Sequence, residues 1–154
     1  MAAILRYHLQ SGERSLVPLL TDEIATVEQY LALELIRFED RLTVERAIEP
    51  SALPCLVPPL ALQMLVENAI KYGVSREAGA GRIALAARVL HDRLEISIRN
   101  TGRLRHSALG STGLGLTNLR TRLRLLFAER AELELQESEP GWVEARMTLP
   151  GTKS

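Results

Sequence analysis

Two spacings of apolar residues alternate along the chain, and their order constrains the fold more than any other feature of the sequence. Gaps of three and four residues mark one face of a helix, whereas every second residue marks one face of a strand. Helical spacing covers residues 20–38, 58–72 and 116–126, and strand spacing covers residues 42–48, 83–89, 94–98, 133–135 and 143–149. This order predicts an α/β (α+β) two-layer sandwich, with the helices on one face of a mixed, mostly antiparallel sheet.

Local signals predict where the first two helices begin and end. Thr21 is the expected N-cap of the first helix, and Asp22 and Glu23 follow in its first turn, where the helix dipole favours carboxylates. The second helix is expected to open on the two prolines at 58–59, because proline is tolerated where amide hydrogens lack partners. We expect this helix to stop at Gly73.

Length, charge and cysteine content exclude several classes of protein. The 154 residues allow one compact domain with a short helical appendage. Lys and Arg number 19, as do Asp and Glu, so the net charge of 0 lacks the footprint of a general nucleic-acid binder. The single cysteine, Cys55, cannot form an intrachain disulfide, and the sequence around it lacks the spaced Cys and His residues of a zinc site, which indicates a reducing compartment. No stretch reaches the roughly 18 apolar residues of a membrane span, so we expect a soluble chain without membrane contact.

The second helix carries three polar side chains that could bind a nucleotide. Asn68, Lys71 and Tyr72 are three and four residues apart and are expected to share one side. An Asn oxygen can bind Mg2+, a Lys ammonium can meet a phosphate, and a Tyr ring can cover a base. Lys71 is also the only internal lysine, since 17 of the 19 basic residues are Arg and Lys153 lies in the tail. The alternative is an ordinary solvated helix face.

Two further segments combine glycine with polar residues. Asn100 and Gly102 follow a strand, where Asn100 could accept a hydrogen bond from an exocyclic amine and Gly102 would let the backbone approach a base. Residues 110–118 form a glycine-rich loop that leads into a helix, and such a helix start offers amide hydrogens to an anion. A plain turn and a flexible loop are the alternatives. A Rossmann site would need a strand directly before the glycines, and the Gly-Lys-Ser/Thr of a Walker A loop is absent.

In their order and spacing, the segments 68–72, 100–102 and 112–116 resemble the three nucleotide-binding boxes of the GHKL ATPase superfamily. Within it, the chain looks like the LytS/AlgZ-like sensor histidine kinases, which residues 58–71, 30–34 and 37–42 also resemble. The resemblance covers nearly everything after Leu20 and implies the Bergerat ATP-binding fold.

The resemblance also implies roles for individual residues. It makes Asn68 the Mg2+ ligand, and it makes Asn68 and Lys71 the catalytic residues. Residues 103–109 would form a short lid. The ATP-binding residues that it implies are Asn68, Lys71, Tyr72, Asn100, Gly102, Thr112, Gly113, Leu114, Gly115 and Leu116. The chain departs from the family pattern at four positions, which are Met64, Asn100, Leu104 and Ser111. Most of the superfamily has Asp at 100 and glycine at 104, so we expect weak ATP binding.

The resemblance finally implies a function and a division of the chain. His8, His91 and His106 lack the context of the family's phosphoacceptor. The expected function is therefore the ATP-binding catalytic domain of a protein histidine kinase, which donates the terminal phosphoryl group to a histidine upstream of this chain. Residues 1–40 would end the dimerisation and phosphotransfer segment, 41–150 would be the catalytic domain, and 151–154 a tail.

The implied partners are the kinase's own phosphoacceptor segment, in a homodimer, and a response regulator. The implied location is the cytoplasmic part of an inner-membrane sensor. Two alternatives stay open: another GHKL kinase of the anti-sigma-factor type, and a degenerate nucleotide-binding module without catalysis.

Overall fold

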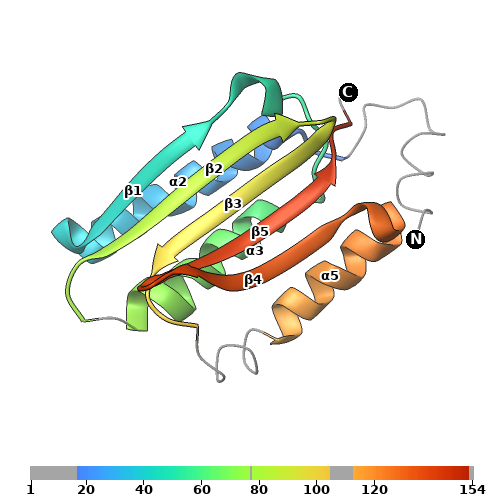
Figure 1. Cartoon of the computed structure of the whole chain (residues 1–154). Helices are drawn as coiled ribbons and strands as arrows, with labels where there is room; N and C mark the ends of the chain where they lie inside the picture. The colour runs from blue at the N-terminus through green and yellow to red at the C-terminus, as the bar shows by residue number, and fades with distance from the viewer. Residues whose placement is uncertain (1–16, 77, 105–112, 153–154) are drawn as a thin grey trace.

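A computed structural model describes residues 17–76, 78–104 and 113–152 (Figure 1). Its sheet has the strand order β1-β2-β3-β5-β4, with β1 parallel to β2 and the other neighbours antiparallel. The strands are β1 (Leu42–Ile48), β2 (Gly81–Leu90), β3 (Arg93–Thr101), β4 (Glu132–Glu139) and β5 (Trp142–Pro150). The helices α2 (Leu20–Phe38), α3 (Ala61–Asn68) and α5 (Gly113–Phe127) lie on one face of this sheet. The predicted two-layer sandwich is therefore confirmed.

The core lies between the two layers. Alternate residues of the central strands are buried, such as Ile83 and Leu85 in β2 and Ile96 and Ile98 in β3. The helices bury one face each against them, through Leu20, Val27 and Leu31 in α2, Leu62, Leu65 and Val66 in α3, and Leu119 and Leu123 in α5. Each such side chain stabilises the fold by about 1.5–3 kcal/mol relative to exposure. The buried face of α2 thus belongs to the same core as the sheet. The expected division of the chain into a helical segment (1–40) and a catalytic domain (41–150) stays a prediction.

The start of α2 differs from the prediction. The helix begins at Leu20 with Leu19 as N-cap, so the assignment of Thr21 as N-cap was wrong. The first backbone N–H groups find partners in a neighbouring loop: Leu20 donates to the carbonyl of Cys55 at 2.8 Å and Thr21 to that of Leu53 at 3.1 Å. These carbonyls replace the side-chain cap that an isolated helix would need. Asp22 does lie in the first turn, as expected, and its carboxylate accepts the Leu19 N–H at 3.3 Å.

The second helix begins later than predicted and changes pitch before it ends. Leu60 has a φ of 63°, outside the helical region, so the helix starts at Ala61 rather than at the prolines. After Asn68 the α-helix gives way to the π-helical turn η3 (Ala69–Gly73) and then to the 3-10 turn η4 (Val74–Arg76). Such π turns are rare and occur often at functional sites.

The strands of the central hairpin are longer than predicted. β3 includes Asn100, which was expected to follow the strand, and Thr101, whereas residues 105–112 lie outside the described residues. His91 and Asp92 form the hairpin turn with φ angles of 50° and 60°, the handedness that suits two-residue hairpins. In the described part of the chain, no helix has the length and apolar character to cross a membrane.

Candidate functional site

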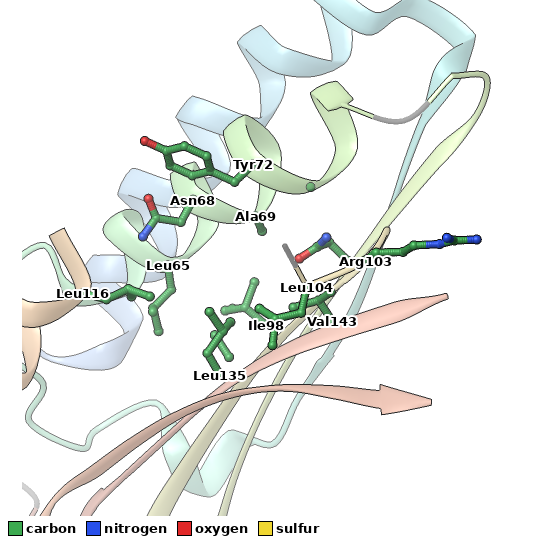
Figure 2. Close-up of a pocket in the computed structure, with 13 residues that line it drawn as sticks. Leu65, Asn68, Ala69, Tyr72, Ile98, Arg103, Leu104, Leu116, Leu135 and Val143 are labelled. Carbon is green, nitrogen blue, oxygen red and sulfur yellow. The ribbon is translucent and has the colours of Figure 1, made fainter. Parts of the chain in front are cut away.

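A cavity of about 40 Å³ lies between the helix layer and the ends of the strands (Figure 2). Its lining comes from α3, η3, α5, β3, β4, β5 and the chain that follows β3. The described lining residues are Leu65, Asn68, Ala69, Tyr72, Gly73, Ile98, Asn100, Arg103, Leu104, Leu116, Leu135, Val143 and Ala145. Most of them are apolar, and the polar groups gather on the helix side and at the end of β3. An apolar cleft with a few polar groups is typical of a site that binds a small molecule.

The end of α3 supplies Asn68 and Tyr72. Leu65 and Val66 bury the apolar face of the helix, which directs Asn68 toward the cavity. Figure 2 shows Asn68 and Tyr72 on the same side of the helix. Lys71, although described, does not line the cavity: it is exposed, and its Nζ lies 5.0 Å from the centre of the Tyr72 ring. The π turn after Asn68 rotates less per residue than an α-helix, so Lys71 does not take the place on the helix face that α-helical spacing predicted.

The end of β3 supplies Asn100. Its side chain is only 5% exposed, and its Nδ2 donates a hydrogen bond to the carbonyl of Thr101 at 3.0 Å. The neighbouring Gly102 does not line the cavity. With a φ of 137°, it instead donates its N–H to the carbonyl of Gly141 at 2.9 Å, which ties the end of β3 to the turn between β4 and β5.

The glycine-rich segment is described only in part. α5 begins at Gly113, and Leu116 in its first turn lines the cavity. Gly115 lies beside the side chain of Met64 and does not line the cavity. Leu114 follows Gly113 in the first turn of α5, whereas Thr112 lies outside the described residues. Of the predicted lid, residues 105–109 are likewise outside, but Arg103 and Leu104 are described and both line the cavity.

Sequence reasoning missed the apolar side of the site. Leu135, Val143 and Ala145 are inward-facing residues of β4 and β5, and their alternation marked them as buried. The sequence could not show that these strands pair next to β3. In Figure 2, Leu104 lies among these apolar side chains, while Arg103 extends away from them.

Asn68 is the residue of the lining that suits a hard cation. Its amide oxygen matches the oxygen ligands that Mg2+ prefers. No group of three or more His, Cys, Asp or Glu side chains that could hold a metal occurs among the described residues. Phosphate and water oxygens are further ligands that a Mg2+ ion commonly takes.

A buried carboxylate, Glu23, lies beside the start of α3. Burial raises the pKa of Glu23, while the backbone N–H groups of Leu60 and Leu62 and the charge of Arg122 lower it in part. Arg122, from α5, donates to the carbonyl of Pro59 just before the same helix. These contacts hold α2, the start of α3 and α5 together on the side of the molecule that carries the cavity.

Comparisons with known proteins show sequence similarity to sensor histidine kinases. The family described as "Histidine kinase" matches residues 1–42. The sensor protein LytS of Staphylococcus haemolyticus is 32% identical over 153 residues, which is 92% of this chain and 26% of LytS. The chain thus spans about a quarter of the length of the curated relatives it matches.

Solved structures share the fold. The catalytic domain of histidine kinase ThkA superposes with a TM-score of 0.66 at 14% identity, covering 86% of this chain and 92% of that one. Full-length ShkA, solved in complex with AMPPNP, gives a TM-score of 0.65 at 19% identity, covering 92% of this chain and 32% of that one.

Proposed function

We propose, on the premise that this chain is the catalytic domain of a LytS-like sensor histidine kinase, that its cavity binds Mg-ATP for transfer of the terminal phosphoryl group to a histidine. One observation carries the proposal: Asn68 from α3 and Asn100 from β3, distant in sequence, line one cavity together with Leu116 of α5. The complex of the structurally similar ShkA with AMPPNP supports a nucleotide as the ligand.

In this proposal, residues in and beside the cavity each bind one part of the nucleotide. Asn100 accepts a hydrogen bond from the exocyclic amine of adenine, and Tyr72 covers the base. Gly102 lets the backbone turn close to the base. Asn68 gives its amide oxygen to Mg2+, and the exposed Lys71 reaches toward the phosphates as a flexible point charge.

The start of α5 meets the phosphates. The backbone N–H groups at a helix N-terminus lack partners within the helix and favour an anion. In this proposal the residues that cradle the phosphates are Thr112, Gly113, Leu114, Gly115 and Leu116. Glycine at two of these positions keeps side chains away from the phosphate oxygens.

Phosphoryl transfer needs positioning and neutralisation of charge more than covalent chemistry. Asn68 would hold a Mg2+ ion, which would supply part of that charge, and the ammonium of Lys71 would supply the rest; the attacking nucleophile would be a histidine nitrogen on the kinase's own phosphoacceptor segment. We propose that the full-length kinase is a homodimer, that it passes the phosphoryl group to a response regulator, and that this domain is the cytoplasmic part of an inner-membrane sensor.

Calorimetric titration with ATP, ADP and AMP, with and without Mg2+, tests the nucleotide site. We expect Lys71→Ala to weaken ATP about tenfold or more and AMP hardly at all, because a hydrogen bond to a charged group contributes about 1.5–3 kcal/mol. Asn100→Ala should weaken all three nucleotides alike, because they share the adenine. Arg88→Ala, on the opposite face of the sheet, is the control. An absence of binding at millimolar ATP would contradict the proposal.

A second candidate, a nucleotide-binding module without catalysis, is favoured by the small cavity and by Leu104 at a position where the superfamily has glycine. Incubation with labelled ATP and a separate fragment that carries the phosphoacceptor histidine distinguishes the two. Label on that histidine supports the kinase; binding without label supports the module.

A further inference from the structure

Gly73, at the end of the π turn, packs directly against the side chain of Asn100. Gly73 is buried, and a Cβ built on it would overlap Nδ2 of Asn100 and lie 2.7 Å from Cγ and 3.3 Å from Oδ1. Real Cβ atoms do not approach other heavy atoms to 2.7 Å. Any other amino acid at position 73 therefore requires the Asn100 amide to move.

The backbone of Gly73 does not itself require glycine. The glycines with a positive φ among the described residues are Gly79, Gly102 and Gly141. Gly73 closes a helical turn, and the next residue continues with a φ of −55°. In such a backbone alanine is more favourable than glycine by roughly 0.5–1 kcal/mol. Glycine at this position thus provides space for Asn100 rather than conformational freedom.

That space lets the Asn100 amide take the orientation in which its nitrogen bonds to the carbonyl of Thr101. Nδ2 is the atom nearest to Gly73, and it donates its hydrogen bond to the carbonyl of Thr101 at 3.0 Å. One N–H of the amide is donated to Thr101, and the oxygen is the atom of the amide that can accept a hydrogen bond in the cavity. If the amide turned over, it would present N–H donors there instead.

We propose that Gly73 is a positioning residue for purine selectivity, because it holds Asn100 with its oxygen toward the base and so selects a 6-amino over a 6-oxo purine. This inference rests on the proposed function, in which the cavity takes a purine nucleotide. An amine at position 6 donates to the Asn100 oxygen, whereas a 6-oxo group would face that oxygen with a second acceptor.

Calorimetry with three nucleotides tests the inference. They are ATP, inosine triphosphate, which carries a 6-oxo group, and purine riboside triphosphate, which carries only hydrogen at that position. In the unmodified protein we expect ATP to bind about tenfold or more tighter than inosine triphosphate. In Gly73→Ala this ratio should fall toward one, while the affinity for purine riboside triphosphate stays within about twofold, because that base makes no contact with the amide.

Two further variants separate positioning from general destabilisation. Gly81→Ala is the matched control, because its Cβ would crowd the buried Val74 at 2.5 Å, outside the cavity lining. It should keep the ratio of ATP to inosine triphosphate. The double variant Gly73→Ala/Asn100→Ala removes the amide that the new methyl group would strike. It should melt at a higher temperature than Gly73→Ala alone and select between the two nucleotides no better than Asn100→Ala.

The outcomes separate the role of Gly73 from the proposed binding of a nucleotide. An unchanged ratio in Gly73→Ala, or no recovery of melting temperature in the double variant, overturns the role of Gly73 even where ATP still binds. An unmodified protein that binds ATP and inosine triphosphate equally also overturns it and leaves the nucleotide site intact. An unmodified protein that binds none of the three overturns both.

Discussion

Leu104 is one of the apolar residues that line the cavity. Its backbone N–H donates to Oε1 of Glu137 at 3.1 Å, which fixes the chain there, and its side chain lies among the apolar residues of the site. The cavity of about 40 Å³ is narrow, and Leu104 is one of the apolar side chains that line it. We expect the side chain of Leu104 to move aside when a base binds.

We expect Leu104→Gly to increase ATP affinity several-fold, because the leucine side chain no longer has to be displaced. The same change should lower the free energy of unfolding by about 1–2 kcal/mol through lost apolar burial. Calorimetry and urea denaturation measure the two effects, and Leu125→Ala, at a leucine that is 45% exposed on α5, is the control. ATP affinity that is unchanged or weaker would show that Leu104 does not obstruct the base.

Glu23 makes the stability of the fold depend on pH. Burial raises its pKa above the ordinary value of 4.5, so between 4.5 and the raised pKa the folded protein binds more protons than the unfolded chain. Stability from this group therefore falls as pH rises through that window. Glu23→Gln removes this titrating group. The free energy of unfolding of the variant minus that of the unmodified protein should therefore be greater at pH 7 than at pH 4.

Urea denaturation at pH 4, 5.5 and 7 checks this prediction. Glu28→Gln is the control, since Glu28 forms a surface ion pair with Arg46 at 2.5 Å and is 38% exposed. If the free energies of unfolding of Glu23→Gln and of the unmodified protein changed with pH in the same way, burial would not control the pKa of Glu23.

Helix α2 is the element whose role follows most clearly from its packing. Leu20, Val27 and Leu31 are fully buried in the core that α2 shares with the sheet, and the first turn of α2 bonds to the loop before α3. Removing the helix would expose the apolar faces of α3 and of β1 that it contacts. Three buried aliphatic side chains alone account for about 4.5–9 kcal/mol, comparable to the whole stability of a small domain.

A shortened chain that starts at Arg41 should therefore fail to fold cooperatively. Circular dichroism during thermal unfolding measures this, and a chain that starts at Val17 is the control, which should unfold in one transition. A cooperative transition in the shorter chain would place α2 outside the folding unit.

Elements whose identity depends on local pattern were predictable, and those set by neighbours were not. Alternation predicted β2 and β3, and helical spacing predicted α2 and α5, because each buries a face of fixed period. The late start of α3 depends on the left-handed Leu60, and the cap of α2 depends on carbonyls more than thirty residues away. The candidate site followed the same rule: Asn68 and Asn100 could be predicted from motifs, but the apolar wall from β4 and β5 depends on strand pairing.

The molecule as a whole has two unlike faces. The described helices cover one face of the sheet (Figure 1), while the other face carries ion pairs. Two of them join neighbouring strands, Glu45 to Arg82 and Glu95 to Arg88, whereas Glu139 of β4 pairs with Arg99 of β3 and Glu144 pairs with Arg146 within β5. Apart from the pair of the buried Glu144, these pairs are largely exposed and contribute little each, about 0–1 kcal/mol, so stability comes mainly from the helix side, where the cavity lies.

The parallel pairing of β1 with β2 also sets an order of events when the chain folds. The hairpins β2–β3 and β4–β5 join strands that follow one another and need only short loops to close. The pairing of β1 with β2 closes a crossover that contains all of α3, and the pairing of β3 with β5 spans α5 and β4. Contacts of such long sequence separation form slowly. A newly made chain would thus form its two hairpins first, and the cavity, whose lining comes from α3, β3 and β5, would form only when these distant segments meet.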